Sequence, residues 1–129
     1  MNLSTLITIK NILVIIPMLI HVYIMYLETF LWVKKRKVFG MSEELALQTR
    51  TLAFNQGLYN GFLAAGLIWS FIISDFFWSL NLQTFFLSCI FIAGIAGAKT
   101  VSKRIFFVQS IPALLPLVCI LWIWALFQQ

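Results

Sequence analysis

The sequence predicts an all-α fold, an integral membrane bundle of four transmembrane helices that forms one domain over residues 1–129. Composition is the first reason, since 62% of the residues are hydrophobic, 10% are charged and the mean hydropathy is +0.99. A chain this short cannot bury so much apolar surface in one water-soluble core. The second reason is that the apolar residues form four long stretches, with no proline- or glycine-rich linker between them.

The four stretches are the expected membrane spans. Each crossing of the hydrocarbon needs about 20 apolar residues in a helix, because no water is present to satisfy the backbone amides. The first runs from 12 to 33 and is expected to stay uncleaved, since it is too long for a signal peptide and lacks a small-residue cleavage site. The second runs from 51 to 73. The third, from 82 to 98, is marginal in length, and the fourth runs from 105 to 127.

The distribution of lysine and arginine predicts the orientation. Eight of the nine basic residues flank the first and third connections, and Lys10 alone lies on the opposite side of the first span. By the positive-inside rule, these connections face the cytoplasm and both termini face outward. Topology therefore explains the net charge of +5, and we expect no nucleic-acid partner. Within the first connection, Ser42 followed by Glu43 and Glu44 predicts the start of a short helix.

Small residues predict where helices meet closely. In the second span Gly57, Gly61 and Ala64 share a face with Gln56 and Asn60, and small residues on one face let another backbone approach. The opposite face is expected to contact lipid; it carries Phe54, Leu58, Phe62, Ala65 and Trp69. Small residues also recur in the third span, at positions 93, 94, 97 and 98. Packing within the bundle is the expected role of these surfaces, and a homodimer contact is the alternative.

Polar residues inside the spans indicate a candidate site. An ionisable group in hydrocarbon costs at least about 2.5 to 3.5 kcal/mol, so Glu28, and His21 seven residues before it on the same face, need partners. At about 1.5 Å per residue, several polar groups reach the depth of Glu28 in the cytoplasmic half of the bundle. The sequence therefore predicts an inward-opening polar cavity with a ligand site formed by His21, Glu28, Asn55, Gln56, Tyr59, Asn60, Lys99 and Gln109.

Two alternatives accompany this cavity. The amides and hydroxyls could serve only to join helices, and Lys99 could be an end-cap whose ammonium reaches the membrane surface. Pro112 and Pro116 are expected to kink the fourth span and to free the carbonyls of Val108 and Pro112, which would then line the cavity.

Metal and cofactor chemistry are not expected. Cys89 and Cys119 fall at nearly the same depth as His21, but they lack the short ligand spacing of a zinc site. The sequence contains no nucleotide-binding glycine loop, nucleophile elbow or metalloprotease motif. We therefore expect neither a metal nor a cofactor.

Four strings of residues resemble a known family. They are HVYIMYLE at 21–28, NQGLYNGFLAAG at 55–66, AGIAGAKTVSK at 93–103 and FVQSIPA at 107–113. Together they are similar to the bacterial family of small integral membrane proteins called domain of unknown function thirteen hundred and four. The resemblance implies a multi-pass protein of the bacterial inner (plasma) membrane, but it implies no activity.

Three functions are compatible with the sequence. One is a small transporter or binding protein, in which Glu28 exchanges a proton for a cationic or amphipathic molecule. Another is an intramembrane enzyme that acts on a lipid, with Glu28 and His21 as acid and base, although about 10 Å of helix separates them. The third is a structural or assembly protein. The expected partners are membrane lipids and, for the first function, a small-molecule ligand.

Overall fold

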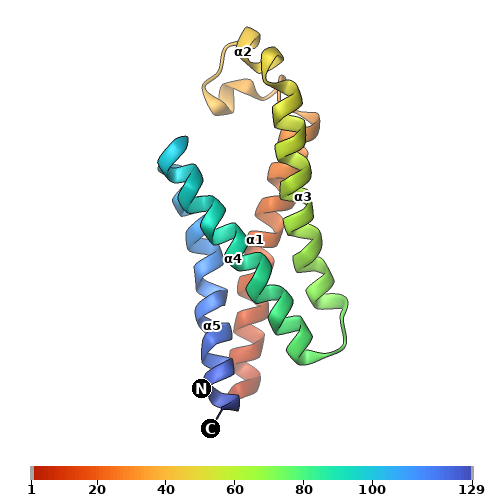
Figure 1. Cartoon of the computed structure of the whole chain (residues 1–129), viewed down its shortest axis with the longest axis vertical. Helices are drawn as coiled ribbons and strands as arrows, with labels where there is room; N and C mark the ends of the chain where they lie inside the picture. Colours follow the sequence, from red (N-terminus) through yellow and green to blue (C-terminus); the bar gives the residue numbers. More distant parts are fainter. Residues whose placement is uncertain (1, 129) are drawn as a thin grey trace.

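The computed structural model describes residues 2–128, which form helices joined by short turns, with no strand among them (Figure 1). The all-α prediction is therefore confirmed. A 3-10 helix, a short α-helix and a π-helical segment accompany four long helices. In chain order the elements are α1 (Leu3–Phe30), η1 (Arg36–Phe39), α2 (Glu43–Gln48), α3 (Arg50–Ile72), α4 (Phe76–Thr100), η2 (Phe106–Ser110) and α5 (Ile111–Phe127).

Polar side chains fix three of the helix starts. Asn2 accepts a hydrogen bond from the Thr5 amide at 2.8 Å and begins α1. Ser42 caps α2 as predicted. Asp75 accepts from the Trp78 amide at 2.8 Å and begins α4. Helix α4 therefore starts at residue 76 and not at 82, and its 25 residues make it longer than predicted.

Helix α1 also begins earlier than predicted, because the cap at residue 2 precedes the apolar stretch. The helix therefore includes Lys10, whose exposed fraction is only 2%. Lys10 therefore lies inside the first helix, whereas the first span was expected to begin at residue 12. At the other end α1 stops at Phe30, and residues 31–35 lead into η1.

Three helical segments are long and apolar enough to cross a membrane: Leu3–Phe30, Phe76–Thr100 and Phe106–Phe127. These three are characteristic of an integral membrane protein. Helix α3 has 23 residues and is long enough, but it is not one of the three. Asn55, Gln56 and Asn60 lower its mean hydropathy.

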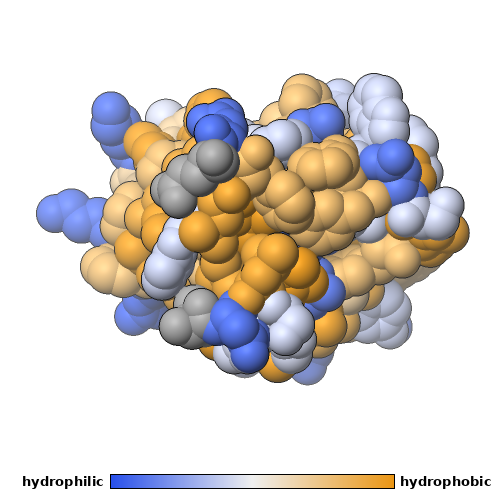
Figure 2. Space-filling view, turned by 90° about the horizontal axis from the view of Figure 1, so that it is seen from below, coloured by the Kyte–Doolittle hydropathy of each residue, from blue (hydrophilic) through white to orange (hydrophobic). Residues whose placement is uncertain are grey.

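The four long helices pack in a ring. Helix α1 contacts α3 and α5, and α4 contacts the same two helices. Helix α1 begins, and α5 ends, at one end of the bundle, and α2 lies at the opposite end (Figure 1). Seen from the end where α1 begins, most of the surface is hydrophobic (Figure 2). The core lies among the four helices and includes Leu67, Leu87, Ile90 and Ile120.

The exposed face and the packed face predicted for the second span agree with the burial of α3. Phe54, Leu58, Phe62 and Trp69 are exposed, and Gly57 faces α1. A Cβ atom at Gly57 would clash with Thr29 Oγ1 and would lie 3.1 Å from the carbonyl oxygen of Met25. A Cβ at Gly61 would also meet Met25, at its sulfur. These glycines therefore serve packing within the bundle, the role expected of them.

Candidate functional site

A cavity of about 620 Å³ lies between the helices, on the side of the bundle toward η1 and α2. Helices α1, α3 and α4 form its walls together with η1 and the turn that leads into α5. Its polar lining includes Glu28, Gln56, Tyr59, Asn60 and Gln109. Because 62% of the Tyr59 side chain is exposed, the cavity opens to the outside of the bundle.

One hydrogen bond forms the centre of this cavity. The side-chain amide of Asn60, on α3, donates to Glu28 Oε2, on α1, at 2.8 Å. The same amide donates to the backbone carbonyl of Gln56 at 3.1 Å. Asn60 is 6% exposed, so both of its amide hydrogens are held by protein. Within residues 2–128, no second side chain donates to the Glu28 carboxylate, which leaves Glu28 Oε1 able to accept from a ligand.

The close contact between α1 and α3 positions this pair. Gly57 lies one turn before Asn60, and its missing side chain leaves the space that Thr29 and the Met25 carbonyl occupy. Because Thr29 follows Glu28 directly, the approach at Gly57 brings the carboxylate within reach of Asn60. The glycine surface of α3 and the polar pair are therefore parts of one local structure.

A π-helical segment forms part of the opposite wall. In η2 the amide of Ile111 donates to the carbonyl of Phe106, five residues earlier. Pro112 has no amide hydrogen, which removes one α-helical bond at this point and favours the wider turn. Gln109 lies within η2 and lines the cavity, and the Ser110 hydroxyl donates to the Phe91 carbonyl at 3.0 Å. Val108 and Pro112 are not in the lining, so the expectation that their carbonyls line the cavity is wrong.

Aromatic rings surround the polar centre. The rings of Trp32 and Phe39 pack with their centroids 4.8 Å apart. The indole of Trp32 donates to Thr49 Oγ1 at 3.1 Å, which ties the end of α1 to the start of α3. Gly40, at a φ of 67°, ends η1 in a left-handed turn. With Tyr59, these two rings give the cavity three aromatic side chains near one carboxylate.

Comparison with known proteins identifies the family. The family described as "Protein of unknown function (DUF1304)" matches residues 15–121. The chain belongs to the DUF1304 family. This membership confirms the resemblance seen in the four sequence strings. A protein of Lactococcus lactis subsp. lactis (strain IL1403), named "Uncharacterized protein YpaA", is 40% identical over 100 residues, which cover 74% of this chain and 82% of the relative. No solved structure matches the chain significantly.

Five of the eight predicted site residues line this one cavity, and all five lie within the segment that matches DUF1304. The structure places the other three elsewhere. His21 is fully buried, and its Nδ1 atom lies 2.8 Å from the carbonyl oxygen of Pro17. Asn55 is exposed and is not in the lining. Lys99 lies near the end of α4 and lines a separate pocket.

Two features of this DUF1304 protein were missed by sequence reasoning. The first is the aromatic pair of Trp32 and Phe39, which the conformation of the first connection brings over the site. The second is a buried polar chain at the other end of the bundle. There Lys10 Nζ donates to Gln83 Oε1 at 2.8 Å, and Gln83 Nε2 lies 3.4 Å from Ser79 Oγ. The early position of the Asn2 cap was the available signal that Lys10 belongs to a helix.

The cavity combines one acidic side chain with aromatic side chains. Its one carboxylate can attract a positive charge, and aromatic faces attract cations through their quadrupoles. Glu28 is the only acidic, basic or histidine side chain in the lining. In this arrangement a proton and a cation could compete for the same oxygen atoms of Glu28.

Proposed function

We propose that this protein binds a cationic or amphipathic small molecule in the cavity around Glu28 and transports it across the membrane in exchange for a proton. The observation that carries this proposal is the carboxylate of Glu28, held by Asn60 at 2.8 Å in a cavity of the helix bundle that three aromatic side chains also line. A cavity of about 620 Å³ is also within the usual range for small-molecule sites, roughly 300 to 1,000 Å³.

The proposal includes four membrane spans, with α3 as the fourth. At about 1.5 Å per residue, the 23 residues of α3 are long enough to cross the hydrocarbon. Two of its polar residues, Gln56 and Asn60, face the cavity, and this placement supports a span that hydropathy alone does not indicate. Such inward-facing polar groups are tolerated in membrane helices when the protein satisfies them.

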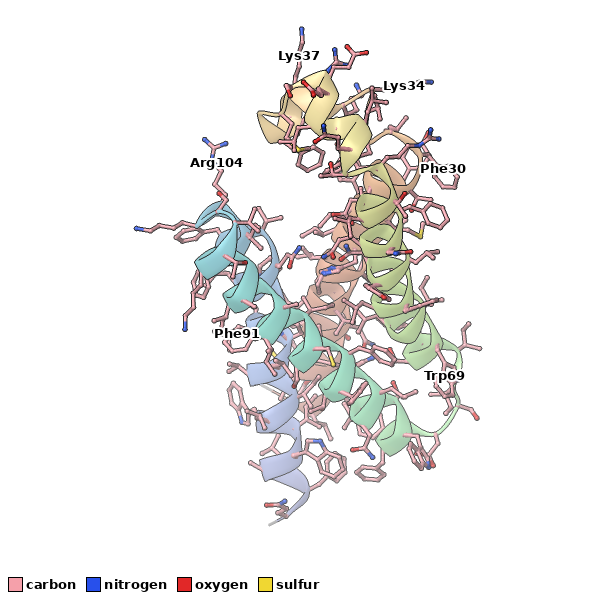
Figure 3. The ribbon with its side chains drawn as sticks, turned by 45° about the horizontal axis from the view of Figure 1, so that its top comes forward. Phe30, Lys34, Lys37, Trp69, Phe91 and Arg104 are labelled. Atoms are coloured by element: carbon pink, nitrogen blue, oxygen red, sulfur yellow. The ribbon has the colours of Figure 1, made fainter. Side chains whose placement is uncertain are left out.

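The proposed orientation places the cavity mouth in the cytoplasm of a bacterium, at the inner membrane. Lys34, Lys37 and Arg104 lie at the same end of the bundle (Figure 3). Basic residues gather on the cytoplasmic side of membrane proteins, which supports an outward position for both ends of the chain.

The alternatives have less support. Catalysis on a lipid would join Glu28 with His21, but His21 does not line the cavity. A homodimer through the small residues is not favoured, because Gly57, Gly94 and Gly97 already contact helices of the same chain. A purely structural role for the Glu28–Asn60 pair is an outcome that the following experiment can detect.

The test measures binding of tetraphenylphosphonium to the purified protein by isothermal titration calorimetry from acidic to alkaline pH. We expect affinity to fall as the pH drops, because a proton neutralises Glu28. Glu28→Gln should bind weakly at every pH, and Asn60→Ala should weaken binding but retain its pH dependence, since an amide does not titrate. Glu44→Gln is the matched control, because Glu44 is an exposed acid outside both the cavity and the Arg36–Glu43 salt bridge.

Binding alone does not establish transport, so the second measurement uses proteoliposomes that contain a pH-sensitive dye. Tetraphenylphosphonium added on one side should release protons on that side only when Glu28 is present. Equal affinities in wild type and Glu28→Gln would assign the polar pair to helix packing. Binding without proton movement would mean that the protein binds the cation but does not exchange it for a proton.

A further inference from the structure

A second pocket lies on another face of the bundle, at the turn between α4 and η2. Its volume is about 450 Å³. Ala98 and Lys99 of α4 line it, together with Lys103 of the turn and Phe106 and Phe107 of η2. It shares no lining residue with the Glu28 cavity. Arg104, at the same turn, projects away from the helices (Figure 3).

The two ammonium groups of this pocket have no acidic partner. Over residues 2–128, the one salt bridge joins Arg36 to Glu43. Glu44 accepts from Gln48 within α2, and the pocket lining itself contains no acidic residue. Lys99 and Lys103 are both exposed, so their charges are available to an anion from outside the protein.

The other wall of the pocket is apolar. The rings of Phe106 and Phe107 pack edge to face with centroids 5.6 Å apart, and Phe107 is 68% exposed. Both residues open the apolar segment Phe106–Phe127, which is long enough to cross a membrane. If this segment crosses a membrane, the lysines would lie at the level of the lipid headgroups and the phenylalanines beside the first carbons of the acyl chains.

We propose that this pocket binds one anionic phospholipid, with its phosphate between Lys99 and Lys103 and an acyl chain along Phe106 and Phe107. Charge complementarity selects the anionic headgroup, and the aromatic wall selects a lipid over a free phosphate ion. The site is separate from the proposed cation site, and it does not depend on the function proposed for Glu28.

Native mass spectrometry of the detergent-purified protein tests the site, with phosphatidylglycerol and phosphatidylcholine of identical acyl chains as probes. Wild type should retain phosphatidylglycerol preferentially. The double variant Lys99→Gln/Lys103→Gln should lower the affinity for phosphatidylglycerol about thirtyfold, or about 2 kcal/mol, of which each lysine near the lipid surface contributes about half. Its affinity for phosphatidylcholine, whose choline group offsets the phosphate charge, should fall much less.

The matched control is Lys34→Gln/Lys37→Gln, which removes the same charge at the same end of the bundle but outside the pocket. We expect less than about a twofold change for this variant, because the lipid is bound locally. Phe107→Ser should also weaken phosphatidylglycerol, whereas added inorganic phosphate should not displace it.

Three results would overturn the proposal. Equal losses in the two double variants would mean that a diffuse surface potential attracts the lipid. Displacement of phosphatidylglycerol by inorganic phosphate would mean that the pocket binds anions without any contribution from the acyl chain. A wild-type protein without preference for phosphatidylglycerol would mean that the pocket has no lipid selectivity.

Discussion

Gly57→Ala is the sharpest test of how the candidate site is assembled. An added Cβ at this position would clash with Thr29 Oγ1 and lie 3.1 Å from both the Met25 carbonyl oxygen and the Thr29 amide nitrogen. Backbone atoms cannot move aside alone, so α1 and α3 must separate slightly. At Gly61, by contrast, the nearest atom is the sulfur of the flexible Met25 side chain, at 2.8 Å. Gly61→Ala is therefore the matched control.

The expected magnitude follows from three effects. Alanine gains about 1 kcal/mol of helix propensity over glycine in both variants. Overpacking against backbone costs about 1 to 3 kcal/mol, and a strained Glu28–Asn60 bond forfeits up to about 0.6 to 2 kcal/mol more. We expect Gly57→Ala to be less stable than Gly61→Ala by about 2 kcal/mol, and Gly61→Ala to match or exceed wild type.

The assay is unfolding in mixed micelles by titration with sodium dodecyl sulfate, followed by tryptophan fluorescence. Combining Gly57→Ala with Thr29→Ala should restore part of the lost stability, because it removes the clashing hydroxyl and leaves the two backbone contacts. If Gly57→Ala proves as stable as Gly61→Ala, α1 and α3 do not approach as closely as described, and the positioning of Glu28 needs another explanation.

Three further predictions concern other parts of the bundle. Gln83→Leu should destabilise the protein by about 1 to 3 kcal/mol in the same assay, because it leaves the buried side-chain donor of Lys10 without its acceptor. Lys10→Met should cost less, and a larger cost for Lys10→Met would contradict the pairing. Phe39→Ala should weaken tetraphenylphosphonium binding by about 0.5 to 2 kcal/mol, measured by calorimetry, and an unchanged affinity would remove its ring from the site. In a variant without native cysteines, Lys37→Cys should react with an impermeant maleimide only from the cytoplasm and Ser74→Cys only from outside; the reverse would invert the proposed topology.

The centre of the candidate site was predictable from the sequence for a physical reason. Carboxylates and amides are unfavourable in hydrocarbon, so Glu28 and Asn60 were expected to turn toward protein, and the fixed rise of a helix gives their relative depth. The amide of Asn55, which is exposed, does not follow this rule. Periodicity likewise identified the exposed and packed faces of α3, because side chains three and four residues apart share a face. These arguments require only that the helices form.

What the sequence did not predict depends on local backbone conformation. Phe39 reaches the cavity because η1 and the left-handed turn at Gly40 fold the first connection over it, and hydropathy carries no information about such a turn. Lys99 faces a different pocket for a reason that periodicity could have shown: α4 lines the cavity with residues 93, 96, 97 and 100, which share one helix face, and Lys99 lies off that face. Lys10 was misplaced because its charge was taken as a boundary, whereas Gln83 allows it to be buried.

The connection between α3 and α4 contains only residues 73–75, and this brevity bears on how the protein is made. Three residues reach at most about 10 Å, so the end of α3 and the start of α4 must lie on the same side of the hydrocarbon, which is about 30 Å thick. If α3 spans the bilayer as proposed, the two helices form a tight hairpin, which favours their entering the membrane together. Insertion of the strongly apolar α4 can then favour insertion of the less apolar α3, because the amides of α3 can turn toward α4 and the rest of the protein. Lengthening this connection with a flexible insert should therefore leave α3 outside the membrane in a fraction of the newly made chains.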